Sequence, residues 1–124
     1  MLYIGNNDKQ FNDASRIRQA FKDRFGSQLG PDCSTQYHND YNCFLEITRV
    51  PVGPFTVSEW SIFVLPEFLL PMMQWATQYR EQYTIFIHPN SGCQVEDHSD
   101  WAMFNGPAYP LDLSYLDPDR PFPW

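Results

Sequence analysis

Apolar residues along positions 1–88 switch between helical and strand-like spacing, and the order of these segments leaves few folds open. The first helical stripe is expected between a cap at Asn12 or Asp13 and a stop at Gly26. It contains four apolar residues at helical intervals: Ala14, Ile17, Phe21 and Phe25. A second stripe begins after Pro66, and its apolar residues are Leu69, Met72, Ala76 and Tyr79. Pro71 lies inside this second helix and predicts a kink or a late start.

Strand-like alternation separates and follows the two helices. Residues 42–49 and 59–65 alternate with a period of two, and the turn-rich segment 50–54 joins them. Residues 83–88 are rich in β-branched and aromatic side chains, and place Thr84, Phe86 and His88 on one face. Residues 2–4 form a short apolar run that is compatible with a strand remnant. Beyond residue 88 we expect irregular structure.

The resulting order is strand, helix, strand, strand, helix, strand, which is the split βαβ pattern of ferredoxin-like α+β domains. A chain of 124 residues is the size of one ordinary domain, so residues 1–124 are interpreted as a single domain. Five prolines in the tail, residues 107–124, exclude a regular helix, and its aromatic residues suggest that it wraps on the body. A fold of this kind does not define a function.

Charge and cysteine content narrow the classes of partner. A net charge of −7 disfavours nucleic acid, whose binding depends on clustered Lys and Arg, and favours a small-molecule ligand. No apolar segment is long enough to suggest a membrane span, and no leader is recognisable. Cys33, Cys43 and Cys93 lack the spacing of a zinc site, so they are interpreted as three free thiols of a cytoplasmic protein.

The residues best suited to chemistry lie at the end of the last strand. His88 ends that strand, and His98 follows a polar turn that contains Asn90 and Ser91, so both imidazoles can converge on one pocket. Asp97 is adjacent to His98. The alternative is that His88 caps the strand and His98 makes a surface hydrogen bond with a neighbouring aspartate.

A set of short motifs in this half of the chain resembles the DOPA 4,5-dioxygenase family. The motifs are His88 to Gly92, Glu96 to His98, Trp101, Asn105-Gly106 and Leu111 to Leu113. Upstream, residues 49–54 followed by a strand with Trp60 resemble the central element of the same family. The resemblance covers about two-thirds of the chain and implies the fold described above, with His88 and His98 at two of the family's histidine positions.

The resemblance implies ferrous iron held by histidines and extradiol cleavage of a catechol. Two departures affect this expectation. The family opens with a His-x-His strand, where this chain has Asn6 and Asp8 or begins later, and a histidine follows Gly-Pro where this chain has Phe55. Iron on His88 and His98 would therefore need a carboxylate to complete three protein ligands, and the candidates are Glu46, Asp8 and Asp97.

Three hypotheses follow. The first is a family enzyme, without a cofactor, that transforms an aromatic or phenolic secondary metabolite by acid and base chemistry as an isomerase, cyclase or dehydratase. Its expected catalytic residues are His88, His98 and Asp97, and its expected substrate-binding residues are Asn90, Ser91, Trp101, Phe55 and Trp60. The second retains Fe(II) on the two histidines and cleaves a catechol such as DOPA. The third is a non-catalytic module that binds a small molecule. The aromatic content is compatible with a homodimer, but no sequence feature defines an interface.

Overall fold

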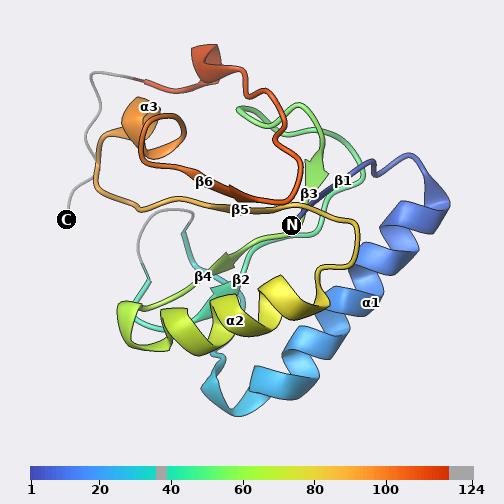
Figure 1. Ribbon diagram of the computed structural model, residues 1–124. Coiled ribbons are helices and arrows are strands. Elements are labelled where there is room, and N and C mark those ends of the chain that lie inside the picture. Colours follow the sequence, from blue (N-terminus) through green and yellow to red (C-terminus); the bar gives the residue numbers. More distant parts are fainter. Residues whose placement is uncertain (36–38, 118–124) are drawn as a thin grey trace.

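The computed structural model describes residues 1–35 and 39–117 and shows a small α+β protein with short antiparallel strand pairs (Figure 1). There are three two-stranded ladders among the described residues: β1 (Leu2–Tyr3) with β3 (Ser58–Glu59), β2 (Cys43–Phe44) with β4 (Ile62–Phe63), and β5 (Ile85–Ile87) with β6 (Met103–Asn105). Because β3 and β4 belong to one segment, and Leu2 bridges Thr84 just before β5, the ladders form a continuous array. The strand order is β2, β3/β4, β1, β5, β6, which confirms the ferredoxin-like arrangement with one added edge strand.

Helix α1 (Asp8–Phe25) begins earlier than the sequence predicted. Asn7, and not Asn12 or Asp13, is the N-cap, and its side chain accepts a hydrogen bond of 3.1 Å from the Gln10 backbone N–H. The predicted apolar stripe is confirmed, since Ala14, Ile17, Phe21 and Phe25 are all buried. The predicted stop is also confirmed, because the α-helix ends at Phe25 and a 3-10 turn (Gly26–Gln28) follows.

Helix α2 (Leu69–Tyr79) starts late, as Pro71 suggested. A 3-10 turn (Pro66–Phe68) precedes it, and Pro71 falls in the first helical turn, where its missing N–H breaks no helical hydrogen bond. Of the predicted stripe only Met72 is buried, while Leu69 and Tyr79 are 42% and 54% exposed. The helix therefore covers the sheet with a narrow face and leaves an apolar side open.

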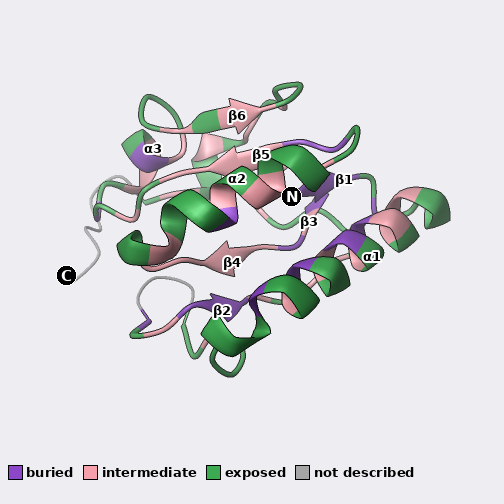
Figure 2. Ribbon diagram, turned by 60° about the horizontal axis from the view of Figure 1, so that its bottom comes forward, coloured by how far each residue is buried: buried purple, intermediate pink, exposed green. Residues whose placement is uncertain are grey.

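Both helices pack on the same face of the sheet, and the main core lies between them and the strands (Figure 2). Phe21 is its centre, with edge-on contacts to Phe44, Trp60 and Trp75 at ring-centroid distances of 5.8, 6.3 and 5.5 Å. Aromatic pairs at these distances stabilise a core beyond the effect of burial alone. The opposite face of the sheet is left for the segments that follow β5.

The region after β5 is more regular than the sequence predicted. It contains a short helix, α3 (Gln94–Asp97), the edge strand β6 and a 3-10 turn (Leu113–Tyr115). The described part of the tail contacts the body, since the Thr84 hydroxyl donates to the Pro107 carbonyl at 2.6 Å and the Thr56 hydroxyl donates to the Pro110 carbonyl at 2.6 Å. Positions 118–124 of the predicted tail lie outside the described residues.

Two cysteines form a disulfide, so the prediction of three free thiols is wrong for Cys33 and Cys43. Their Cα atoms are 5.0 Å apart, because the loop at residues 30–33 lies along β2. Cys93 is free and exposed. Sequence spacing did not show this pairing, since ten residues separate two cysteines that only the folded loop brings together. In residues 1–35 and 39–117, no helix is both long and apolar enough to cross a membrane.

The disulfide predicts a specific thiol count. Without reductant, denatured protein should react with one equivalent of an alkylating reagent, at Cys93, and after reduction with three. Reduction should lower the free energy of unfolding by about 2–4 kcal/mol, the usual effect of opening a short cross-linked loop. Mass spectrometry and urea denaturation measure the two effects, with Cys93→Ser as the control. Three reactive thiols before reduction would contradict the disulfide.

Candidate functional site

His88 and His98 come together on the face of the sheet opposite the two helices. Their ring centroids are 4.1 Å apart and the ring planes are inclined by 35°. His88 directly follows β5, and His98 is the C-cap of α3, so the segment 89–93 returns the chain over the strand it has just left. The sequence predicted this convergence from the polar turn between the two histidines.

Backbone carbonyl groups fix the ring orientation of both histidines. His88 Nδ1 lies 2.7 Å from the Pro89 carbonyl oxygen, and His98 Nδ1 lies 2.8 Å from the Gln94 carbonyl oxygen. A carbonyl oxygen only accepts hydrogen bonds, so each Nδ1 must be the donor. In the neutral form the proton is therefore on Nδ1, and Nε2 of both rings has a free lone pair. Nε2 is the atom that a base or a ligand would use.

Asp97 holds the turn between the histidines. Its side chain is fully buried and accepts hydrogen bonds from the Ser91 backbone N–H at 2.9 Å and from the Ser91 hydroxyl at 2.7 Å. The Ser91 hydroxyl also accepts from the Cys93 backbone N–H at 3.2 Å. These bonds use both carboxylate oxygens, so Asp97 positions α3 and His98. We had predicted that Asp97 is a catalytic acid or base, but its carboxylate is buried and hydrogen-bonded within the turn. Ser91, predicted to bind substrate, makes these hydrogen bonds in the same turn.

Aromatic rings surround the histidine pair. Phe86 lies on the same face of β5 as His88, with ring centroids 5.5 Å apart, and stacks near His98 at 6.1 Å. Phe55 contacts His98 at 6.2 Å and Phe86 at 5.3 Å. Phe104 of β6 contacts Phe86 at 5.0 Å. This row of three phenylalanines, Phe55, Phe86 and Phe104, gives the site an apolar floor.

Phe55 reaches this row because the tail holds its loop. It forms an antiparallel bridge with Leu111, and the Asp112 backbone N–H donates to the Pro54 carbonyl at 2.8 Å. The sequence indicated Phe55 through its position after Gly-Pro. It did not indicate Phe86 or Phe104 as site residues. Alternation along the strand 83–88 would have found Phe86, whereas Phe104 depends on a β5–β6 pairing that no local pattern shows.

The other predicted substrate-binding residues fall in different places. Trp60 is only 4% exposed and packs against Phe21 and Phe44 in the helix-side core, so it does not belong to the site. Strand alternation explains the difference, because Trp60 and the histidines lie on opposite faces of one sheet. Trp101 is half-exposed on the turn after α3, and Asn90 lies in the turn that joins the histidines.

The carboxylates considered as a third iron ligand do not join the histidines. Asp8 starts α1 and forms an exposed ion pair of 2.9 Å with Arg49. Glu46 follows β2, which is three strands from β5, or about 14 Å at the usual strand spacing. The Asp97 carboxylate already accepts two hydrogen bonds from Ser91. The described residues contain no group of three His, Cys, Asp or Glu that could hold a metal, and the remaining histidine, His38, lies outside them. A three-ligand iron site therefore does not fit the donors described.

The environment of His88 disfavours its protonated form. Burial lowers the pKa of His88 from its ordinary value of 6.5, and the nearby His98 lowers it further. The Pro89 carbonyl and the Asp97 carboxylate oppose this shift but do not cancel it. His88 is therefore neutral, with a free Nε2, at and somewhat below neutral pH.

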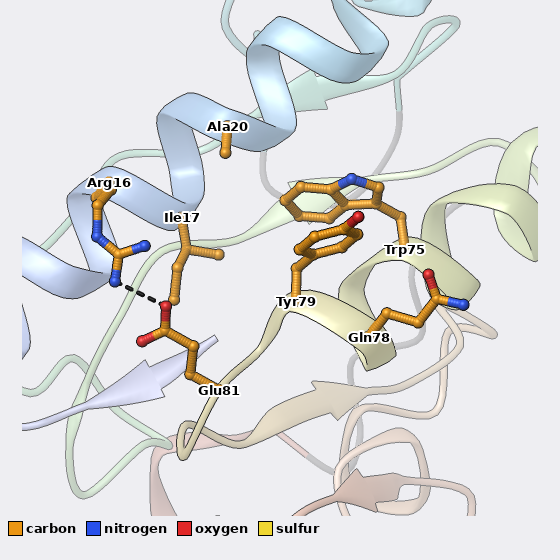
Figure 3. A pocket seen from close by; sticks show the side chains of 7 residues that line it. All are labelled: Arg16, Ile17, Ala20, Trp75, Gln78, Tyr79 and Glu81. Atoms are coloured by element: carbon orange, nitrogen blue, oxygen red, sulfur yellow. Dashed lines mark hydrogen bonds and ion pairs between the residues drawn. The ribbon is translucent and has the colours of Figure 1, made fainter.

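Two surface grooves are lined by neither of the paired histidines. One, of about 140 Å³, runs between α1 and α2, where Trp75 and Tyr79 stack with ring centroids 4.7 Å apart (Figure 3). The Arg16–Glu81 ion pair of 2.8 Å lies at its end. The other lies between α2 and β6. The candidate site is therefore marked by the paired imidazoles and lies outside both grooves.

Comparisons with known proteins agree with this architecture. A family model described as the Dopa 4,5-dioxygenase family matches residues 1–115. A DOPA 4,5-dioxygenase from Amanita muscaria is 29% identical over 66 residues, which cover 53% of this chain but only 29% of that relative. A crystal structure from Nostoc punctiforme, described as a "putative dioxygenase", has a TM-score of 0.67 and 22% identity, covering 85% of this chain and 78% of that one. At this identity the structural likeness supports the fold alone.

The His88 environment predicts a pH-dependent signature. In an NMR titration of the imidazole protons, the His88 midpoint should lie below 6.5, and His98→Gln should raise it because a neighbouring positive charge is lost. Below pH 6.5 the unfolded chain binds more protons at position 88 than the native state, so stability should fall as the pH drops. His88→Gln should remove that part of the slope. A His88 midpoint above 6.5 would contradict the buried, paired environment.

Proposed function

The chain belongs to the Dopa 4,5-dioxygenase family, and from this premise we propose that it is an enzyme acting on a small aromatic or phenolic molecule through acid and base chemistry. Family membership supports a small-molecule enzyme. His88 and His98 are proposed as the catalytic pair, with Asp97 and Ser91 holding the turn that positions them. A secondary metabolite remains our expectation for the substrate.

The observation that carries the proposal is the matched orientation of the two imidazoles. Each Nδ1 donates to a carbonyl, so each neutral ring offers Nε2 as a proton acceptor. Because the rings lie only 4.1 Å apart, protonation of one disfavours protonation of the other. One histidine can therefore accept a proton while its neighbour stays neutral. This arrangement suits transfer of a proton between two positions of one substrate.

The proposed reaction is a proton relocation in an enolisable or phenolic substrate. One imidazole Nε2 removes a proton from carbon or a phenol oxygen, and an imidazolium N–H returns a proton at another position. Atoms and charge balance without an oxidant, which fits an isomerase or cyclase, and loss of water from the same enolate would give a dehydratase. The row of Phe55, Phe86 and Phe104 supplies aromatic faces against which a planar ring can pack.

Ferrous ring cleavage is the second candidate, and the same orientation favours it. Histidines that bind metals usually donate their other ring N–H to a carbonyl or carboxylate, as His88 and His98 do. The described residues provide two such ligands and no third. A non-catalytic module that binds a small molecule is compatible with the same aromatic row. The deuterium-exchange assay below distinguishes this module from an enzyme.

The cytoplasmic location stays a prediction. The Cys33–Cys43 disulfide weighs against it, because disulfides persist mainly in oxidising compartments.

Deuterium exchange tests the acid and base proposal without knowledge of the natural substrate. Purified protein with a chelator is incubated in D2O with a panel of enolisable aryl ketones and phenols, and deuterium incorporation is followed by NMR. We expect exchange in the wild-type protein and a loss of about 10²- to 10⁴-fold in His88→Gln and His98→Gln. Asp100→Asn, at an exposed position two residues after His98, is the matched control. Unchanged exchange in both histidine variants would remove the proposed site, and binding without exchange would favour the ligand-binding module.

Iron content separates the two enzyme hypotheses. After anaerobic reconstitution with ferrous iron and desalting, we expect well below one equivalent of bound iron and no oxygen consumption with a catechol. His88→Gln and His98→Gln should leave this background unchanged. One tightly bound equivalent that both variants abolish, together with a ring-cleaved product, would establish the iron-dependent alternative.

A further inference from the structure

The two edges of the sheet differ in whether another segment covers them. Along the β2 edge, the Gly30 and Cys33 backbone N–H groups donate to the carbonyls of Asn42 and Phe44 at 2.8 and 2.9 Å. The Cys33–Cys43 disulfide holds this covering loop in place. An edge closed in this way cannot pair with another strand.

The β6 edge is open. β6 pairs only with β5, and no described segment pairs with its outer side (Figure 2). The Leu2 backbone N–H bonds to the Thr84 carbonyl, so the backbone groups of Thr84 point to β1 and, by alternation, those of Ile85 and Ile87 point to β6. The partners of Ile85 and Ile87 are Asn105 and Met103. The N–H and C=O of Phe104, between them, therefore face outward.

Apolar side chains flank this open strand on its helix side. Met103 is 56% exposed, and with Met73, Ile87 and neighbouring atoms it lines a groove of about 320 Å³ between α2 and β6. Leu70, 59% exposed, continues the groove along α2, because positions 70, 73 and 77 share one helical face. An open edge strand beside an exposed apolar helix face is a surface that proteins usually cover.

We propose that a second copy of this chain covers this edge, through antiparallel pairing of β6 with the partner's β6 about a twofold axis at Phe104. In this register Phe104 and the partner's Phe104 exchange both outward backbone hydrogen bonds. Met103 then lies opposite the partner's Asn105, and the two α2 faces meet along the extended sheet. One patch is used by both copies, which is the geometry of a closed dimer.

The charges at the ends of β6 are complementary in this register. Arg80 lies beside Gly106, where an added Cβ would be 2.7 Å from the guanidinium. Gly106 falls opposite the partner's Ala102, which follows the exposed Asp100 by two residues. Each end of the paired ribbon therefore brings the segment that carries Arg80 in one copy toward the segment that carries Asp100 in the other, and these two residues have opposite charges. The net charge of −7 on each copy opposes association, so opposite charges at the ends of the ribbon would offset part of this repulsion.

The pairing also extends the histidine site. Phe104 points to the same face as Phe86, its cross-strand partner, and so lies on the side of the sheet that carries His88 and His98. Across the twofold axis, the partner's Phe104 continues the row of Phe55, Phe86 and Phe104. The second copy would supply an aromatic wall next to each site.

Analytical ultracentrifugation of the whole chain, without substrate, tests the dimer independently of the proposed chemistry. We expect wild-type protein at twice the chain mass of 14.6 kDa at micromolar concentration. Phe104→Pro removes the outward N–H together with the Phe104 ring and leaves the β5–β6 ladder bonds, so the dimer Kd should rise about tenfold or more. Met103→Lys, which charges an exposed position, should do the same even if the proline variant does not fold.

The matched control is Ile4→Lys, which adds the same charge at another exposed apolar residue away from β6. It should leave the dimer Kd unchanged, and circular dichroism should show native helix content in every variant compared. A wild-type chain that stays monomeric up to about 100 μM would overturn the proposal. A dimer that resists both Phe104→Pro and Met103→Lys would overturn it as well, because its interface would lie elsewhere.

Discussion

The antiparallel bridge between Leu2 and Thr84 joins the two halves of the sheet, and the position of the candidate site depends on it. Both residues are only 1% exposed, and the Leu2 backbone N–H donates to the Thr84 carbonyl at 2.9 Å. This pairing fixes which face each residue of β5 presents. Ile85 turns to the helix-side core, while Phe86 and His88 turn to the opposite face. A shift of one residue would exchange the faces and place His88 in the core.

Once the faces of β5 are set, local contacts complete the site. The chain turns back through residues 89–93, and the buried Asp97 carboxylate holds that turn through Ser91. Two backbone carbonyls then orient the imidazoles, so the site uses main-chain geometry where many active sites use a charged side chain. The apolar residues around it, contributed by β5, β6 and the loop at Phe55, pack along one side of the histidine pair.

Patterns that repeat within one element were predictable from the sequence. Local spacing predicted the apolar stripe of α1, the late start of α2 and the strand before His88. The order of these elements predicted the ferredoxin-like fold, which the structure confirms. Features that need distant segments were not. Tertiary pairing determines the Cys33–Cys43 disulfide, the strand β6 and the position of Phe104. The start of α1 was predicted too late because the sequence offers several possible capping residues, and Asn7 is the one that caps the helix. Trp60 was misassigned because alternation identifies two faces without showing which carries the site.

The tautomer of the two histidines is the property on which the candidate site depends most directly. Nitrogen-15 NMR with long-range coupling to the ring protons, recorded near pH 8, distinguishes protonated from unprotonated Nδ1 and Nε2. His88 and His98 should both carry the proton on Nδ1, since both Nδ1 atoms face carbonyl oxygens. Protonated Nε2 in either ring would contradict this prediction, because that histidine would then have no free lone pair to act as base or ligand.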